Sequence, residues 1–91
     1  MEVSRAIVRL VNRSGLHARP AHLFVQTANR FAAELRVGRA GMDAVNGKSI
    51  MGMMMLAAEQ GAELELEATG SDAEEQIEAL QALVESGFGE D

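Results

Sequence analysis

One strictly alternating segment, residues 62–69, limits what this chain can fold into more than any other. Apolar and polar side chains take turns along it without a break: Ala62, Glu63, Leu64, Glu65, Leu66, Glu67, Ala68 and Thr69. A period of two residues predicts a β-strand with one buried face and one face in water. The acidic face has to stay solvated, so we expect a sheet that carries its helices on the other face only.

The remaining apolar patterns predict three more strands, over roughly 3–11, 33–37 and 42–45. The interval after the first strand predicts a helix over 17–29. Pro20 stands in its first turn, where a missing N–H group costs little.

Two further helices have start signals of their own. Ser49 is a plausible N-cap for a short helix from residue 50 to about residue 58. Ser71 and Glu74 form a capping box for a last helix that Gly87 ends, and we expect the tail 87–91 to be loose. The last helix should bury one stripe of side chains, made of Ala73, Ile77, Leu80 and Val84.

The element order is therefore β-α-β-β-α-β-α, which fits a split βαβ pattern over its first six elements. We expect an α+β fold: an open-faced two-layer sandwich with a four-stranded antiparallel sheet and three helices on one face. A chain of 91 residues has room for one domain, so residues 1–91 are expected to form a single unit.

The amino-acid composition excludes several classes of function. The chain has no cysteine, which excludes a disulfide framework and thiol catalysis, and no apolar run long enough for a membrane span. Its first residues lack the pattern of a secretory signal, so we expect a cytoplasmic protein. A net charge of −6 argues against general nucleic-acid binding, although all eight basic residues lie within 1–50. We expect no cofactor, and no metal, because His17 and His22 point to different sides of a helix.

Residues 15–20, which read Gly-Leu-His-Ala-Arg-Pro, combine the most chemistry. They place His17 where a helix begins, and the free N–H groups of a helix start, here those of Ala18 and Arg19, favour an anion. The Arg19 guanidinium adds a fixed charge for phosphate oxygens. A neutral imidazole there could accept a phosphoryl group and pass it on, since the P–N bond is labile. A helix-capping or core histidine beside a surface arginine is the other interpretation of the same residues.

Together with residues 46–52, which read Asn-Gly-Lys-Ser-Ile-Met-Gly, this run resembles a known family. The chain is similar to the histidine-containing phosphocarrier (HPr) family of the bacterial phosphoenolpyruvate:sugar phosphotransferase system. The resemblance covers essentially the whole chain and implies a phosphoryl carrier rather than a stand-alone enzyme. His17 would accept the phosphoryl group on Nδ1 from enzyme I, itself charged by phosphoenolpyruvate, and pass it to a sugar-specific enzyme IIA. Arg19 would neutralise the phosphoryl charge.

The resemblance also implies a regulatory serine and a docking surface. Ser49 matches the serine that a dedicated kinase phosphorylates in many Gram-positive relatives, and a kinase/phosphorylase is an expected partner. Ser49 can be both a helix N-cap and a phosphorylation site. The residues that match the apolar contact surface of the family are Leu16, Phe24, Ile50, Met51 and Met54. Flexible methionines suit a surface that fits several partners in turn.

Two alternatives stay open. A split βαβ scaffold also carries small hydrolases of the acylphosphatase type, which would turn over substrate without protein partners. A regulatory paralogue would keep the phosphoryl chemistry and serve another branch, such as one related to nitrogen. We expect a monomer that binds neither nucleic acid nor membrane.

Overall fold

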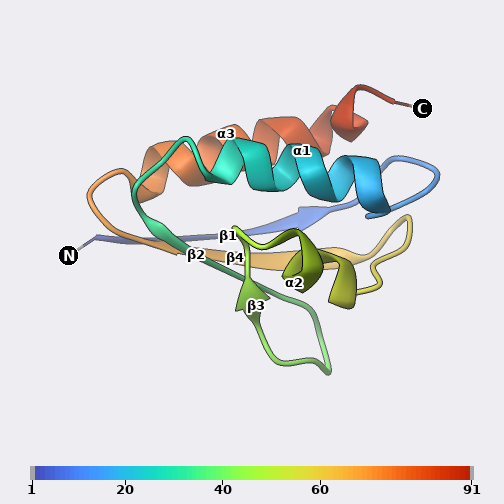
Figure 1. Ribbon diagram of the computed structural model, residues 1–91, viewed down its shortest axis with the longest axis horizontal. Helices are drawn as coiled ribbons and strands as arrows, with labels where there is room; N and C mark the ends of the chain where they lie inside the picture. Colours follow the sequence, from blue (N-terminus) through green and yellow to red (C-terminus); the bar gives the residue numbers. More distant parts are fainter. Residues whose placement is uncertain (1, 91) are drawn as a thin grey trace.

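The computed structural model describes residues 2–90 and arranges them as a sheet with helices packed against it (Figure 1). The strands are β1 (Val3–Arg9), β2 (Glu34–Gly38), β3 (Val45–Asn46) and β4 (Glu63–Thr69). The helices are α1 (Ala18–Ala28), α2 (Ile50–Met55), α3 (Ala73–Glu85) and a short 3₁₀ turn, η1 (Gly87–Gly89). The strands run in the order β1-β4-β2-β3, and every neighbouring pair is antiparallel. The expected α+β open-faced sandwich with three helices on one face is confirmed.

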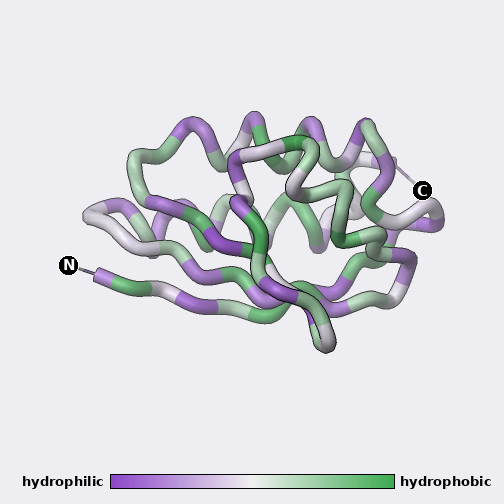
Figure 2. The backbone as a smooth tube through the Cα atoms, turned by 60° about the horizontal axis from the view of Figure 1, so that its bottom comes forward, coloured by the Kyte–Doolittle hydropathy of each residue, from purple (hydrophilic) through white to green (hydrophobic). Residues whose placement is uncertain are grey.

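The alternating pattern of β4 sets the two faces of the sheet. Its apolar side chains, Leu64 and Leu66 among them, are fully buried under the helices. The stripe expected on α3 is buried against them as well: Ala73, Ile77, Leu80 and Val84. Figure 2 shows that β1, the strand that starts at the N label, carries both hydrophilic and hydrophobic positions.

The wet face of the sheet carries cross-strand ion pairs instead of helices. The Arg5 guanidinium lies 2.8 Å from the Glu67 carboxylate, and that of Arg9 lies 2.9 Å from Glu63. The β1–β4 register places each arginine directly opposite its glutamate. Exposed pairs of this kind contribute about 0.2–1 kcal/mol each. They keep the face polar and add little to stability.

Three expected boundaries were too generous. The first strand ends at Arg9, where the β4 ladder ends opposite Glu63, rather than at residue 11. The third strand is not 42–45 but Val45–Asn46, because only these two residues pair with β2. The short helix ends at Met55 rather than near residue 58. In the first strand and the short helix, apolar side chains continue after the backbone has left the ladder or helix. At the third strand, the expected segment begins three residues before the pairing with β2 does.

The expected capping box at Ser71 and Glu74 is wrong. The N-cap of α3 is Asp72, and its carboxylate does not cap its own helix. It accepts hydrogen bonds from the N–H groups of Ala32 and Ala33, both at 2.8 Å. These two donors hold the pKa of Asp72 below its usual range, the Ala32 hydrogen bond being the larger cause. A tertiary contact to the α1–β2 connection thus replaced the local cap that the sequence suggested.

The expectation of a loose tail is also wrong for residues 87–90; Asp91 lies outside the described residues. The chain folds back in η1, and the Phe88 side chain is 4% exposed within the core. Phe88 has a φ of +58°, a left-handed conformation that is rare for a bulky residue and persists only where the surroundings impose it. Gly87 and Gly89 on either side also have positive φ. The turn delivers Glu90 to the start of α1.

Candidate functional site

The connection between β1 and α1 is braced against the segment that follows α2. Gly15 has a φ of +65°, and a Cβ atom there would lie 2.6 Å from the Ala58 carbonyl oxygen. The next residue, Leu16, donates its N–H to that same oxygen at 2.9 Å. Only glycine fits this conformation and this approach without strain. The brace sets the position from which α1 begins.

His17 is the N-cap of α1 and lies at the helix start that the sequence predicted. Its backbone is extended, with φ −84° and ψ −172°, and among the described residues its side chain makes no capping hydrogen bond. The first N–H groups of a helix have no partner within the helix, so those of Ala18 and Arg19 point out of the N-terminus. Pro20 has no N–H to satisfy, and the intrahelical bonds start with Ala21 N–H on the His17 carbonyl at 2.9 Å. Within the described residues, 2–90, the N–H groups of Ala18 and Arg19 have no hydrogen-bond partner, so this helix start can donate to an anion.

The His17 ring is held from the far end of the chain. Its Nε2 atom lies 3.0 Å from Oε1 of Glu90, while 43% of the His17 side chain stays exposed. Buried Asn12 donates from Nδ2 to the same Glu90 oxygen at 2.9 Å and to the Gly15 carbonyl at 2.8 Å. The hydrogen bonds from His17 and then Asn12 hold the pKa of Glu90 below its usual range. Figure 1 shows the start of α1, η1 and the C-terminus at one end of the molecule.

Arg19 is exposed on the first turn of α1. Its positive charge also lowers the pKa of Glu90, so it acts on the same small region as His17. Within residues 2–90 its guanidinium takes part in no ion pair. A histidine, two free backbone N–H groups and an uncommitted guanidinium together suit a tetrahedral anion attached to the ring.

Ser49 begins the second helix of interest and behaves differently from His17. Its backbone is extended, with φ −113°, and its Oγ accepts the Gly52 N–H at 3.0 Å. The expectation of an N-cap at Ser49 is confirmed. The neighbouring Lys48 donates from Nζ to the Phe31 carbonyl at 2.6 Å, which links this helix start to the connection between α1 and β2.

The expected apolar contact surface is only partly at the surface. Leu16 and Phe24 are buried, at 4% and 0% exposure, because they fill the core where α1 and its preceding loop face the sheet. They cannot contact a partner in this conformation, and their place in the surface is corrected. The exposed apolar side chains of α2 are Ile50, Met51, Met54 and Met55, with Met51 and Met55 the most exposed. We call these four residues the α2 apolar patch.

Three residues of this region were not singled out from the sequence. Asn12 was taken as turn chemistry, Glu90 as part of a loose tail, and Met55 as one apolar residue of a helix among several. For Met55, the helical spacing is a usable signal, because it lies four positions after Met51 and so on the same face of a helix with little polar surface. For Glu90, no local signal exists, since its partners lie at the opposite end of the sequence.

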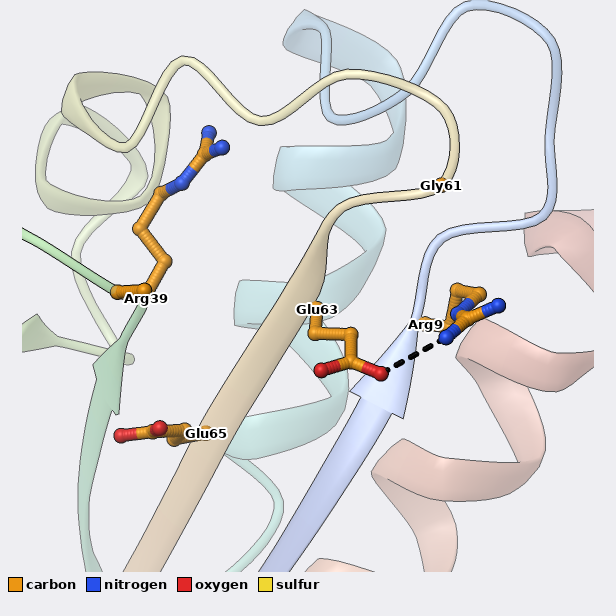
Figure 3. Close-up of a pocket in the computed structure, with 6 residues that line it drawn as sticks. Arg9, Arg39, Gly61, Glu63 and Glu65 are labelled. Atoms are coloured by element: carbon orange, nitrogen blue, oxygen red, sulfur yellow. Dashed lines mark hydrogen bonds and ion pairs between the residues drawn. The ribbon is translucent and has the colours of Figure 1, made fainter.

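A hollow on the surface lies away from His17 and has a different character. It measures about 380 Å³ and is lined by Arg9, Arg39, Ala40, Gly61, Glu63 and Glu65. Figure 3 shows Arg9 and Glu63 paired across it, on neighbouring strands. Neither His17 nor any part of 12–20 lines it. Residues 2–90 contain no cluster of three or more potential metal ligands, and no helix within that range is long and apolar enough to cross a membrane.

The fold and the two motifs agree with comparisons to known proteins. Residues 4–86 match a family model described as the PTS HPr component phosphorylation site. The fold, the two motifs and this match define the class of protein as a phosphoryl carrier of the phosphotransferase system. The chain belongs to the HPr family.

Individual relatives cover nearly the whole chain. Phosphocarrier protein HPr of Neisseria meningitidis is 47% identical over 83 residues, which span 91% of this chain and 92% of that protein. The crystal structure of HPr-C-His from Thermoanaerobacter tengcongensis has a TM-score of 0.91 and 48% identity, over 97% of this chain and 98% of that one. An HPr dimer from the same organism has a TM-score of 0.76 and 49% identity, over 99% of both chains. The likeness therefore extends through both motifs.

Proposed function

We propose that His17 is the phosphoryl acceptor of this protein, charged by enzyme I and discharged to a sugar-specific enzyme IIA. The observation that carries this proposal is the position of His17. It is a half-exposed imidazole at the open N-terminus of an 11-residue helix, with Arg19 on the first turn of that helix. Membership of the HPr family supports the same role, with Nδ1 as the acceptor atom.

The proposed chemistry uses groups already in place. The Nδ1 lone pair attacks phosphorus as the bond to the donor breaks, and the group later leaves by the reverse step. The N–H groups of Ala18 and Arg19 and the dipole of α1 favour the added negative charge. The Arg19 guanidinium neutralises part of it. Little else is needed on this chain, because the partner supplies the rest of the reacting groups, and the protein acts as a carrier rather than a stand-alone enzyme.

The proposed docking surface is the α2 apolar patch. Its side chains are exposed although a soluble helix normally covers such residues. Helices α1 and α2 are in contact, which puts the patch on the helix beside the one that His17 starts. Methionine side chains adapt to differently shaped partners, as serving both enzyme I and an enzyme IIA requires.

Regulation through Ser49 forms part of the proposal. A serine kinase would place a phosphate at the start of α2, one residue before the α2 apolar patch. There its charge would oppose an apolar contact with enzyme I or enzyme IIA. Ser49 Oγ already accepts the Gly52 N–H, and phosphate oxygens can accept from the same helix start.

The working state that we propose is a cytoplasmic monomer, since docking needs the α2 apolar patch free. The second candidate function is phosphoryl transfer in a regulatory branch of the phosphotransferase system rather than in a sugar branch. The enzyme IIA that accepts the phosphoryl group distinguishes the two functions. Sedimentation at working concentration tests the monomer, and a dimer like that solved for T. tengcongensis HPr would contradict it.

The deciding experiment is intact mass after incubation with phosphoenolpyruvate, magnesium and a matched enzyme I. One phosphoryl group is expected on the wild-type chain, lost on brief acid treatment, and none on His17→Ala. His22→Ala is the matched control, because it removes an exposed histidine from the same helix and should be labelled in full. Labelling of His17→Ala would refute the site. Steady release of phosphate without partners would favour the hydrolase instead.

A further inference from the structure

We propose that the methionines of the α2 apolar patch, above all Met51 and Met55, are a site of reversible oxidation. A peroxide converts their thioethers to sulfoxides and so blocks docking of this protein to its partners. The inference rests on the proposed function, because it takes the α2 apolar patch as the docking surface. It gives that surface a second input, of a different chemical class from a phosphate on Ser49.

The first step concerns which sulfur atoms an oxidant can reach. The chain has six methionines and no cysteine, so all of its sulfur is in thioethers. The methionine at position 1 lies outside the described residues, and the other five differ widely in exposure. Met51 is 77% exposed and Met55 67%, against 45% for Met42, 43% for Met54 and 0% for Met53. Because a peroxide in solution meets exposed sulfur first, the structure ranks Met51 and Met55 first and Met53 last.

The second step concerns how these side chains are arranged on α2. Met51 and Met55 are four residues apart, so they are neighbours on one face of the helix. Met53 stands between them in the sequence and lies on the opposite face, where it is fully buried together with Leu56. The short helix is therefore anchored through one face and presents two adjacent thioethers on the other.

The third step is the reaction itself, which needs a peroxide and no other group of this chain. A lone pair of the sulfur attacks one oxygen of hydrogen peroxide, and the O–O bond breaks. The electron pair of that bond leaves with the second oxygen, which becomes water after proton transfer. The sulfur is oxidised by two electrons and the peroxide is reduced by two. In the return reaction, a methionine sulfoxide reductase oxidises two thiols to a disulfide, and the oxygen leaves as water.

The fourth step concerns the effect on docking. Oxidation turns a flexible apolar side chain into a polar one, whose oxygen accepts hydrogen bonds. Burying such an oxygen against an apolar partner surface, with no donor opposite it, weakens binding by about tenfold. The core keeps its packing, because Met53 is out of reach of solvent. Oxidation of the α2 apolar patch should therefore affect complexes with partners and leave the fold and the chemistry of His17 as they are.

The test treats the purified protein with hydrogen peroxide, removes the peroxide with catalase and follows each methionine by peptide mass. We expect one added oxygen on Met51 and Met55 first and on Met53 last. The oxidised protein should accept a phosphoryl group from a limiting amount of enzyme I at least about tenfold more slowly than before treatment. Labelling by phosphoramidate, a small phosphoryl donor that needs no protein partner, should be unchanged. Methionine sulfoxide reductase with a thiol should restore the rate with enzyme I.

Leucine variants connect the loss of rate to the patch. Leucine is apolar and close to methionine in volume, and peroxide does not oxidise it. The triple variant Met51→Leu, Met54→Leu and Met55→Leu should show the same rate with enzyme I before and after peroxide. Each protein is compared with its own untreated rate, so any effect of leucine on docking itself cancels.

Met42→Leu is the matched control. It removes a thioether about as exposed as that of Met54, but from the connection between β2 and β3, outside the α2 apolar patch. After peroxide it should lose as much of its rate with enzyme I as the wild-type protein does.

Three results would overturn the inference. One is a wild-type protein that is oxidised at Met51 and Met55 and is still labelled by enzyme I at its untreated rate. Another is a triple variant that peroxide slows as much as the wild type, and the third is oxidation of Met53 as early as Met51. Failure of the carrier proposal looks different, because enzyme I would then fail to label even the untreated protein. That result would reject the docking role of the patch and this inference with it.

Discussion

Helices α1 and α2 both start from an N-cap residue with extended backbone, and the two residues use this position in opposite ways. Both N-cap residues, His17 and Ser49, are extended, as capping requires. Ser49 turns its oxygen onto the Gly52 N–H and closes its helix start. His17 turns its ring away, to Glu90, and leaves its helix start open. The comparison shows that the N–H groups of a helix start can either bond to the cap residue, which stabilises the helix, or remain available to a ligand. The side chain at the N-cap position decides between the two.

The largest expected effect comes from closing the open start. His17→Ser places a good cap where the backbone already has the right conformation. We expect complete loss of phosphoryl acceptance together with a gain of about 0.5–1 kcal/mol in the free energy of unfolding. Intact mass and urea denaturation measure the two effects. A variant less stable than wild type would show that His17 contributes more to the fold through Glu90 than an open helix start costs.

The next effect concerns the charge beside the open start. Arg19→Ala should lower the rate of labelling by enzyme I by about 100-fold, the usual cost of removing one preorganised donor from a developing charge. Arg13→Ala, in the loop before His17, removes an equal charge that is also exposed and should cost less than threefold. Stopped or quenched labelling followed by mass measurement gives both rates. Equal losses would mean that the overall charge of this end of the molecule matters, and not the place of Arg19.

A smaller effect is expected at the closed start. Ser49→Ala removes the cap on Gly52 and should cost about 1 kcal/mol of unfolding free energy, with phosphoramidate labelling of His17 unchanged. Ser49→Asp can keep the cap but adds a charge next to the α2 apolar patch, and should slow labelling by enzyme I alone. An unchanged enzyme I rate in Ser49→Asp would place Ser49 outside the docking surface.

The smallest expected effect concerns the start of a third helix, α3, whose N-cap residue is Asp72. Asp72 caps the N–H groups of Ala32 and Ala33 rather than those of α3, and these bonds lower its pKa. A carboxylate with a lowered folded pKa stabilises the protein above its unfolded value, about 3.9, and loses that stabilisation as the pH falls through the folded value.

Asp72→Asn should therefore flatten the fall in melting temperature between about pH 5 and pH 3, because its amide no longer titrates. Thermal unfolding across that range measures the slope, with Glu74→Gln on the first turn of the same helix as the control. A slope unchanged from wild type would mean that other carboxylates carry the acid sensitivity.

Local pattern was a good guide wherever the deciding interactions are local. The strand at Glu63–Thr69 follows from alternation alone. The cap at Ser49 follows from residue type and position, and the helix start near His17 follows from the place of Pro20. The two-layer architecture follows from one acidic face that has to remain in water. The prediction failed at the start of α3, where Ser71 and Asp72 are neighbouring residues that can both accept hydrogen bonds. There, the hydrogen bonds from Ala32 and Ala33, which are distant in the sequence, determine the role of Asp72.

The docking surface shows a similar limit. An apolar pattern tells which side chains avoid water, but not which of them the core has room for. Phe24 is fully buried between α1 and the sheet, while Met51 and Met55, on the short helix α2, are exposed to solvent. The sequence alone does not distinguish the buried from the exposed apolar residues, because their burial depends on how α1 and α2 are placed against the sheet.

By itself, the sequence determined the open-faced sandwich, the family, and a histidine with an arginine at the start of a helix. These depend on periodicity and on neighbours a few residues apart. Only the tertiary structure decided that residues 87–90 fold back, and that Glu90 and Asn12 meet at the ring of His17. Contacts between the two ends of a chain depend on the packing of the whole core, here on burying Phe88, and no local pattern specifies them.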